Sequence, residues 1–414
     1  MILPAPLRAL CVSMATIAGS FSGAVAGPAP MTREAFVERV LRTSPAVASI
    51  DARVALGRAG SDAAGRWSNP EVGWQRSAAV SGRRADESED ELTLRLPLVL
   101  SGRLGLEREA ARASAEAEAS RGRGRRVALA REARLAFDAV WASRARVAVL
   151  DDASTAVQEA RRIVLQRALA GESTGYEGQR MEFEAALLED LRVAAVAEQA
   201  RAESRATAML GANDTDGAAF ETDPTGAPDP ALPPEPPIAA SPEVEALEHD
   251  RLAAEAEATA AGRRGVPEPT LTAGAQWLDA GEAGQGAAYV VGVSVPLPVF
   301  DAGRESAAVA SARAHAARTE RAERVRLVET ERSRLRAELQ ARRARRATHQ
   351  EAVLARAERL RELAIAAWKA GGIELPALLD AHRAFREARL SSLELTLDAR
   401  NTETELLFIL GIDT

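Results

Sequence analysis

The chain has 414 residues, of which 46% are hydrophobic, 27% charged and only 4% aromatic. This length is enough for two ordinary domains or for one long duplicated unit. The formal net charge of −7 argues against a nucleic-acid-binding protein, and the single cysteine, Cys11, excludes zinc fingers and a disulfide framework. The low aromatic content argues against an enzyme with a core rich in Phe, Tyr and Trp.

The N-terminus is typical of an export signal. Arg8 precedes a short apolar run over residues 9–18, and Ala24-Val25-Ala26 has the small-x-small pattern that signal peptidase cuts. A membrane anchor is the weaker alternative, because the run falls short of the ~20 residues that a spanning helix needs. We therefore expect residues 1–26 to be a signal peptide, and the mature chain to be exported without cysteine or a helical membrane span.

The rest of the sequence is one unit written twice, at an offset of roughly 200 residues. The repeated motifs are Ser44-Pro45 with Ser241-Pro242, Leu96–Arg103 with Val295–Arg304, Ala170-Gly171 with Ala370-Gly371, and Leu210-Gly211 with Leu410-Gly411. Dense proline between the halves blocks helix and favours an extended linker. We expect a first repeat over 27–211, a linker over 212–240 and a second repeat over 241–414.

Each repeat is expected to contain, in order, a helix, two strands, a very long helix, a sharp break and a shorter helix. In the first repeat these are the helix 32–66, strands near 72–80 and 91–100, the long helix 104–170 and the helix 174–210. In the second they are the helix 242–263, strands near 270–277 and 289–297, the long helix 305–370 and the helix 375–410. The second strand of each pair alternates apolar residues with a period of two, which indicates two unlike environments.

The long helices contain no proline and are dominated by Ala, Arg, Glu and Leu. At 1.5 Å per residue each would run about 100 Å. Apolar residues recur every seven positions, as in Leu150, Val157 and Val164, which predicts lateral packing as coiled coils. The shorter helices are too short to cover the long ones alone. We therefore expect the helices before the strands to stack end to end on the shorter helices and make up the missing length.

Four strands per chain constrain the architecture. Each is long enough to cross a bilayer when tilted, but four strands cannot close a barrel, and open sheet edges are not tolerated in lipid. Several chains must then share one barrel, with 8 strands from two chains or 12 from three, and only the larger leaves a water path. The alternative is a soluble coiled-coil rod with a small antiparallel sheet.

Two stretches carry a resemblance to the TolC-like outer-membrane efflux factor family. Residues 295–304 resemble the family's strand-to-helix exit, and residues 368–383 resemble its periplasmic helix-turn-helix tip. The resemblance implies a mainly α fold with a small β part, in which a homotrimer forms a periplasmic α-barrel and a 12-strand outer-membrane β-barrel. Residues 96–103, together with residues 296–301, are most similar to the heavy-metal (cobalt-zinc-cadmium type) branch.

The family resemblance also implies a function. The chain would be the outer-membrane channel of a tripartite efflux system, a passive exit duct in outer-membrane lipid for substrates that an inner-membrane pump delivers through a periplasmic adaptor. The competing function is a periplasmic coiled-coil structural or adaptor protein. Adaptors carry one helical hairpin flanked by lipoyl-like β domains, which this two-fold repeat lacks.

The same resemblance places functional positions at the periplasmic tip. Gly171 and Gly371, the latter followed by Gly372, fall in the helix–helix turns that contact the adaptor. Family members often carry Val-Gly-Leu there, so the adaptor contact is expected to differ. Asp380 falls where the family has an acidic ring around the periplasmic aperture, and Glu177 is the acidic candidate in the first repeat. A solvated acid on a helix surface is the alternative for both.

The sequence contains no motif for catalysis or for a cofactor. G-x-S-x-G, a Gly-rich phosphate loop and a Cys-His pair are absent, and no histidine has a second ligand at metal spacing. We therefore expect neither an enzyme nor a metal site. The densest basic run is interpreted as a solvated helix face, with headgroup or nucleic-acid binding as the alternative; it consists of Arg121, Arg123, Arg125 and Arg126.

Overall fold

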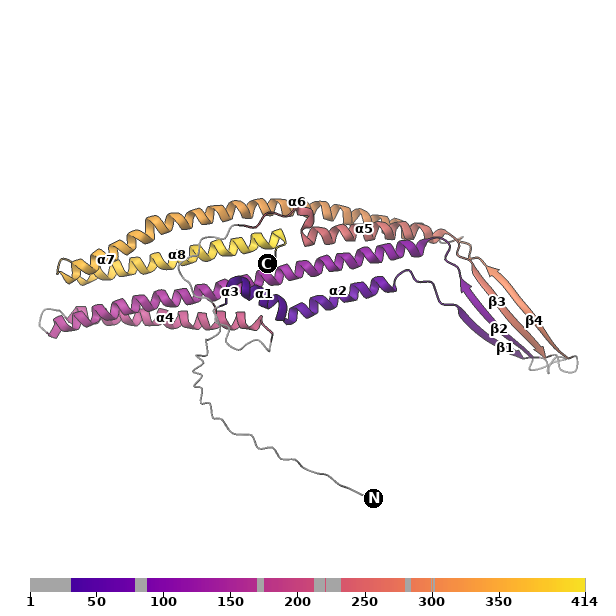
Figure 1. The fold of residues 1–414 in the computed structure, drawn as a ribbon, viewed down its shortest axis with the longest axis horizontal. Coiled ribbons are helices and arrows are strands. Elements are labelled where there is room, and N and C mark those ends of the chain that lie inside the picture. Colours follow the sequence, from indigo (N-terminus) through magenta and orange to yellow (C-terminus); the bar gives the residue numbers. More distant parts are fainter. Residues whose placement is uncertain are drawn as a thin grey trace, which may run out of the picture.

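The protein is elongated, with a helical body at one end and a four-stranded sheet at the other (Figure 1). The computed structural model describes residues 31–78, 88–169, 175–211, 220, 232–279, 284–298, 300 and 302–413. The predicted signal peptide 1–26, Gly171 and most of the predicted linker 212–240 lie outside these residues. No helix of the described segments is both long and apolar enough to span a membrane.

The first repeat contains α1 (Arg33–Thr43), α2 (Pro45–Ala63), β1 (Glu71–Ala78), β2 (Ser88–Pro97), α3 (Arg103–Leu169) and α4 (Gly175–Ala208). The second contains α5 (Pro242–Gly262), β3 (Thr270–Asp279), β4 (Gln285–Ser294), α6 (Arg304–His349), α7 (Ala355–Lys369) and α8 (Leu375–Leu410). Short 3₁₀ turns, Ile238–Ala240 and Arg263–Gly265, flank α5. The predicted fold class, mainly α with a small β part, is confirmed.

Two of the predicted helices are interrupted. The predicted helix 32–66 is wrong as a single element, because Ser44 is extended (φ −64°, ψ 134°) and Pro45 starts a new helix. A residue before proline is disfavoured in the α conformation, whereas proline fits the first turn of a helix. In the second repeat a π-helical segment, Gln350–Leu354, separates α6 from α7, while α3 is continuous over 67 residues.

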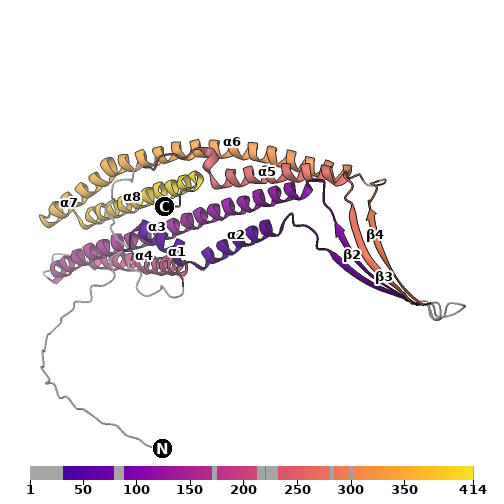
Figure 2. The same ribbon diagram turned by 45° about the vertical axis from the view of Figure 1, so that its right-hand side comes forward.

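The helices of the body form one curved layer. Next to the sheet the order across the layer is α6, α5, α3 and α2, and at the far end it is α7, α8, α3 and α4 (Figures 1 and 2). The predicted heptad residues of α3 are buried in this layer, as Leu150, Val157 and Val164 show. By contrast, Val353 of the π-helical segment and Leu360 of α7 are exposed on the edge of the layer.

The shorter helices stack end to end on the helices that precede the strands, as predicted. Gly411 ends α8 with φ +76°, and the amides of Gly411 and Ile412 donate to the carbonyls of Phe408 and Leu407. This is a left-handed helix cap of the Schellman type. A Cβ on Gly411 would lie 2.6 Å from Cδ of Pro242, which starts α5. In the first repeat a Cβ on Gly211 would lie 2.6 Å from the Thr43 carbonyl oxygen, just before α2.

The sheet joins the two repeats. All neighbouring strands are antiparallel, in the order β1-β2-β3-β4, so β2 of the first repeat pairs with β3 of the second. The register pairs Leu92 with Ala275 and Leu96 with Leu271. One continuous sheet therefore fixes the two halves of the helical layer relative to each other at this end.

The end-to-end joint gives a test of the fold. We expect Gly411→Ala to lower the free energy of unfolding by about 1–3 kcal/mol, since the left-handed backbone and the proline contact both disfavour a Cβ. Gly178→Ala is the matched control, because Gly178 lies within α4 with open space around it, and alanine there should be neutral or mildly stabilising. Thermal unfolding followed by circular dichroism measures both. Equal midpoints for the two variants would contradict the joint.

Candidate functional site

The strand register sorts the sheet into two unlike faces. Directly paired residues of antiparallel strands project to the same side, and successive residues alternate. One side, the apolar sheet face, carries Val72, Trp74, Leu92, Leu94, Leu96, Leu271, Ala273, Ala275, Trp277, Tyr289, Val291 and Val293. The other side, the polar sheet face, carries mainly polar residues and glycine, with Leu278, Ala288 and Val290 as apolar exceptions; the polar residues and glycines are Gly73, Gln75, Glu91, Thr93, Arg95, Thr272, Gly274, Gln276, Gly292 and Ser294.

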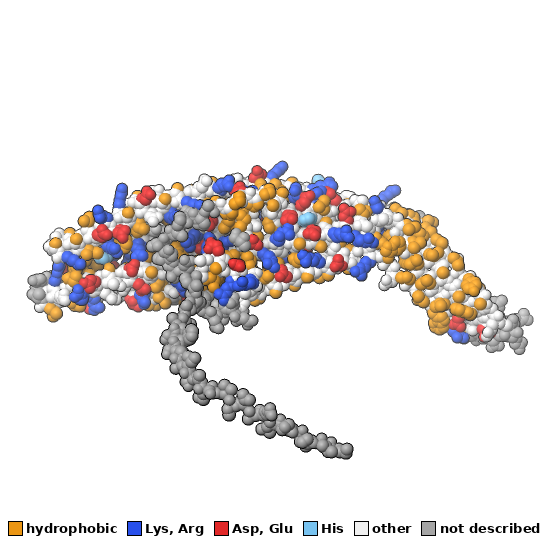
Figure 3. All heavy atoms as spheres, viewed as in Figure 1, with side chains coloured by type: hydrophobic (Ala, Val, Ile, Leu, Met, Phe, Trp, Pro, Cys, Tyr) orange, Lys and Arg blue, Asp and Glu red, His pale blue; other side chains and the backbone are white. Residues whose placement is uncertain are grey.

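The apolar sheet face is open to the surroundings of the chain. Tyr289 is 92% exposed and Val291 78%, and Trp74 is also largely exposed. Figure 3 shows this face as a continuous hydrophobic surface, in contrast to the mixed charges of the helical body. The charged pair Arg76 and Asp90, 3.7 Å apart, lies on the same face towards the hairpin ends. A sheet with one apolar and one polar face is suited to hydrocarbon on the apolar side and water on the polar side.

The outer edges of β1 and β4 pair with no strand in the part of the chain that the structure describes. The sheet order ends at these two strands. The outward N–H and C=O groups of an edge strand need partners, and in hydrocarbon they cannot obtain them from water. The sheet is therefore incomplete in one chain.

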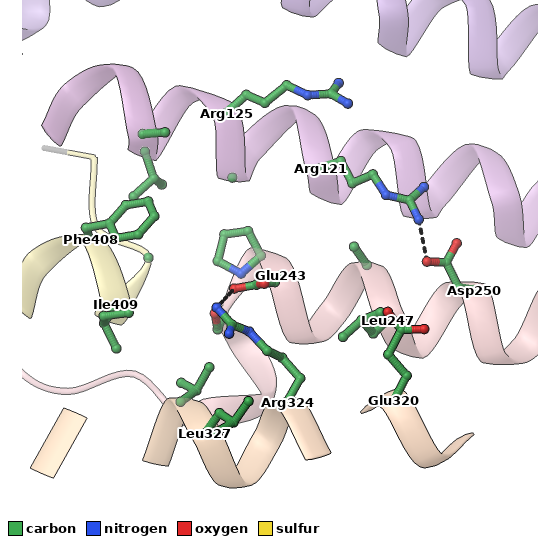
Figure 4. A pocket seen from close by; sticks show the side chains of 18 of the residues that line it. Arg121, Arg125, Glu243, Leu247, Asp250, Glu320, Arg324, Leu327, Phe408 and Ile409 are labelled. Atoms are coloured by element: carbon green, nitrogen blue, oxygen red, sulfur yellow. Dashed lines mark hydrogen bonds and ion pairs between the residues drawn. The ribbon is translucent and has the colours of Figure 1, made fainter. Parts of the chain in front are cut away.

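The helical body carries an open hollow of about 880 Å³ between α3, α5, α6 and α8, at the joint of α8 with α5. Its floor is apolar and includes Leu327 and Phe408 (Figure 4). Ion pairs border it, one between Arg121 and Asp250 and one between Arg324 and Glu243. The carboxylates of Glu320 and Glu323 also line the hollow, and no metal-binding cluster of His, Cys, Asp or Glu occurs among the described residues.

The basic run of α3 must be reinterpreted. Its arginines are not a free solvated face, since each of the four forms an ion pair with a carboxylate. The pairs are Arg121 with Asp250 and Glu118, Arg123 with Glu245, Arg125 with Glu118, and Arg126 with Asp51. Most of these acids lie on α2 and α5, so the run links three neighbouring helices of the layer.

The described members of the predicted tip residues lie at the far end of the body from the sheet; Gly171 lies outside the described residues. Gly371 ends α7 with φ +77°, and the amide of Gly372 donates to the Ala367 carbonyl at 2.8 Å, the same cap as at Gly411. Asp380, on α8, has a 75% exposed side chain, 3.7 Å from Nη1 of Arg383. Glu177 is half-buried in the first turn of α4. The roles of these residues at an aperture and an adaptor contact remain predictions.

A buried charge pair that the sequence analysis missed crosses between the two helical hairpins near the tip. Glu184 of α4 has a 2% exposed side chain and accepts a hydrogen bond from Nε of Arg383 at 3.1 Å, with Nη1 of Arg386 4.0 Å away. The hydrogen bond from Arg383 lowers the pKa of Glu184 below its ordinary value. Glu184 and Arg383 are 199 residues apart, which is close to the offset between the two repeats. They therefore occupy equivalent positions of the repeats with opposite charges, and this pattern in the sequence could have indicated the pair.

A second buried network crosses the middle of the layer. Asp138 of α3 is fully buried, 2.8 Å from Arg33 of α1 and 3.4 Å from Arg400 of α8. Arg33 also reaches Glu403, which Arg343 of α6 contacts at 2.8 Å. Burial raises the pKa of Asp138, while the two arginines act in the opposite direction. The network joins the start of the first repeat to the end of the second, and nothing local in the sequence indicates it.

Comparisons with known proteins agree with this architecture. A family model described as outer membrane efflux protein matches residues 237–412. Among solved structures, CusC matches with a TM-score of 0.77 and 19% identity over 92% of each chain. VceC of Vibrio cholerae matches with a TM-score of 0.74 and 17% identity, over 92% of this chain and 96% of that one. CmeC of Campylobacter jejuni matches with a TM-score of 0.75 and 13% identity, over 98% of this chain and 94% of that one. No curated protein sequence matches significantly.

These findings confirm the resemblance to the TolC-like outer-membrane efflux factor family. The second repeat matches the family model, and the chain as a whole has the fold of these channels. The second repeat is thus similar to outer membrane efflux proteins, and the chain has the fold of outer-membrane channels with a long helical portion. The family match also supports the prediction that the chain is not an enzyme.

The Glu184 pair gives a test near the tip. Glu184→Gln should lower the free energy of unfolding by about 1–3 kcal/mol at neutral pH, because it leaves two arginines without their buried partner. Glu182→Gln is the matched control, since Glu182 and its partner Arg161 are both half exposed, and should cost at most about 1 kcal/mol. Urea unfolding followed by circular dichroism compares the two.

The pH dependence of the same pair has a defined sign. A lowered carboxyl pKa contributes stability above the ordinary value of 4.5, and this contribution is lost as the pH falls through the folded-state pKa. The stability difference between wild type and Glu184→Gln should therefore narrow below about pH 4.5. A difference that stays constant down to pH 3 would contradict the assignment.

Proposed function

We propose that this chain is the outer-membrane component of a tripartite efflux system. It acts as a passive exit duct for substrates that an inner-membrane pump delivers through a periplasmic adaptor. The observation that carries the proposal is the sheet with one exposed apolar face, one polar face and two unpaired edges. The family match favours this channel over the alternative of a periplasmic adaptor.

Three chains provide the closed barrel that one chain cannot. Joining β4 of one chain to β1 of the next pairs every edge, and three sheets give 12 strands. Two chains would give 8 strands, a number whose interior is filled by side chains. With the apolar sheet face outwards, the Glu91, Thr93 and Gln276 side chains would line a water path.

The edges of the helical layer fit the same assembly. At the tip end, α4 and α7 lie on opposite edges of the layer (Figure 1). Each edge carries exposed apolar residues, namely Tyr176, Phe183, Leu187 and Leu191 on α4, and Leu360 and Leu363 on α7. In a ring of three chains, α4 of one chain would pack against α7 of the next, and the helices would form the periplasmic α-barrel.

The tip is the proposed site of contact with the adaptor. Gly371 and Gly372 lie in the turn between α7 and α8 that would meet it, and the predicted tip residue Gly171, outside the described residues, falls between α3 and α4 in the sequence. Asp380 and Glu177 would supply carboxylates to the aperture. The division into a signal peptide (1–26), two repeats (27–211 and 241–414) and a linker (212–240) belongs to the same proposal. The heavy-metal branch also remains a prediction, since CusC and OprN match the fold equally well.

Disulfide trapping tests the shared barrel. A set of double variants should pair a cysteine on β1, starting from Gly73→Cys, with cysteines placed along β4, starting from Gly292→Cys. We expect the β1–β4 pairs to give covalent two-chain and three-chain bands on non-reducing gels, because the two edges meet between chains. Gly73→Cys with Thr93→Cys is the control, since these residues are paired within one chain. Only monomeric bands from every β1–β4 pair would refute the shared barrel.

Ion selectivity tests the acidic aperture. In planar bilayers, Asp380→Asn should lower the preference for cations over anions by roughly tenfold, because a unit charge ~6 Å away in water favours a cation and disfavours an anion by about 0.7 kcal/mol each. Asp398→Asn is the matched control, because Asp398 also lies on α8 and is also 3.7 Å from an arginine, Arg342. An equal effect of both substitutions would show that Asp380 is an ordinary surface acid.

A further inference from the structure

The junction between the helical body and the sheet has an unusual local structure. Of its four chain connections, three contain a glycine with positive φ, namely Gly65, Gly102 and Gly303. A Cβ on Gly65 would lie 2.4 Å from Cγ of Arg108, and one on Gly102 would lie 2.7 Å from Nη1 of Arg263. At Gly65 and Gly102, the absence of a Cβ therefore leaves the space that an arginine side chain occupies.

Two of the junction arginines brace the backbone. Nε of Arg108 donates to the Gly65 carbonyl at 3.0 Å, and Nη1 of Arg263 donates to the Ser101 carbonyl at 3.3 Å. Arg103, in turn, is paired with Glu268 and Glu107. These three arginine side chains are therefore engaged in contacts within the chain.

Three further arginines, Arg66, Arg264 and Arg304, lie at the same junction and are exposed; we call them the arginine collar. Arg66 follows α2, Arg264 lies in the turn after α5, and Arg304 begins α6. None forms an ion pair with a carboxylate of the described residues, and the hydrogen bond of Arg66 is to the Asp62 backbone carbonyl. Their positive charges are therefore available to an external anion.

The extent of the apolar sheet face places the collar relative to a bilayer. From Ala287 to Leu297 every second residue of β4 and its extension is apolar, a run of about 33 Å along the strand and ~25 Å along the normal at a 40° tilt. That height matches the apolar band of outer-membrane barrels. Phe300 is fully exposed just beyond this run, and Trp67 is half exposed next to Arg66.

The level of the collar is thus the level of lipid headgroups. Aromatic side chains such as Trp67 and Phe300 are typical of membrane interfaces, and arginine binds phosphate through its planar set of N–H donors. Figure 3 shows basic side chains on the helical body beside the apolar sheet face. The collar would face the periplasmic leaflet, since the helical body is periplasmic.

We propose that Arg66, Arg264 and Arg304 bind the phosphate groups of phospholipids in the periplasmic leaflet, and so fix the depth of the barrel in the membrane. The inference uses the outer-membrane placement of the sheet and does not depend on the number of chains. It assigns a lipid partner to side chains that the duct itself does not use.

The test uses the full chain purified in detergent. Native mass spectrometry would follow the binding of added phosphatidylglycerol, with diacylglycerol of the same acyl chains as the probe without phosphate. The collar variant is the triple substitution Arg66→Gln, Arg264→Gln and Arg304→Gln. The control variant removes the same charge from exposed arginines far from the sheet, with Arg326→Gln, Arg345→Gln and Arg356→Gln.

We expect the collar variant to need at least about tenfold more phosphatidylglycerol for half-saturation, since each basic side chain at a membrane surface strengthens binding to anionic lipid. The control variant should bind like wild type, and diacylglycerol should bind equally weakly to all three. Unchanged phosphatidylglycerol binding by the collar variant would overturn the proposal. So would unchanged lipid binding together with altered single-channel ion selectivity, which would place the collar in the lumen. The oligomeric state, read from the same spectra, reports separately on the proposed trimer.

Discussion

The structure depends on one constraint, that backbone hydrogen-bonding groups cannot be left unpaired in hydrocarbon. A four-stranded sheet with an exposed apolar face meets this requirement at β2 and β3 and fails it at the outer edges of β1 and β4. The failure is not a defect of the fold, because identical chains can pair these edges with one another. In the proposed assembly the polar sheet face would line a channel and the apolar sheet face would contact lipid.

In the helical body, the helices beside α3 are each too short to cover its length. One continuous helix, α3, runs beside pairs of helices that are joined end to end, and Gly211 and Gly411 make these joints possible because no Cβ fits against Thr43 or Pro242. Arginine and glutamate then connect the helices laterally, and the deepest of these contacts surround Asp138 and Glu184. The layer is therefore held together by charge pairs as well as by small apolar clusters, as the low aromatic content suggests.

Much of this architecture could be predicted from the sequence, because it is written in local periodicity and in the repeat. Alternation along β2 and β4, the proline-free stretch of α3 and the glycine turn at Gly371 each indicate their element directly. The break at Ser44-Pro45 was missed as a helix end although proline signals it, and the π-helical segment at Gln350–Leu354 has no such local signal.

The charge contacts were beyond local reasoning. Three of the four arginines of the basic run on α3 have a partner on α2 or α5, more than 70 residues away, so the sequence could not distinguish a paired face from a free one. Asp138 likewise gains its partners only when α1 and α8 pack around α3. The tip residues were placed by family resemblance. The positions of Gly371 after α7, Asp380 on α8 and Glu177 on α4 agree with it without establishing their roles.

Amide hydrogen exchange of the edge strands in lipid tests the central claim most directly. If the edges of β1 and β4 are paired between chains, all their amides should exchange as slowly as those of β2 and β3. If the sheet ends within one chain, every second amide of β1 and β4 should exchange fast while the others stay protected. That alternating pattern would contradict a barrel shared between subunits.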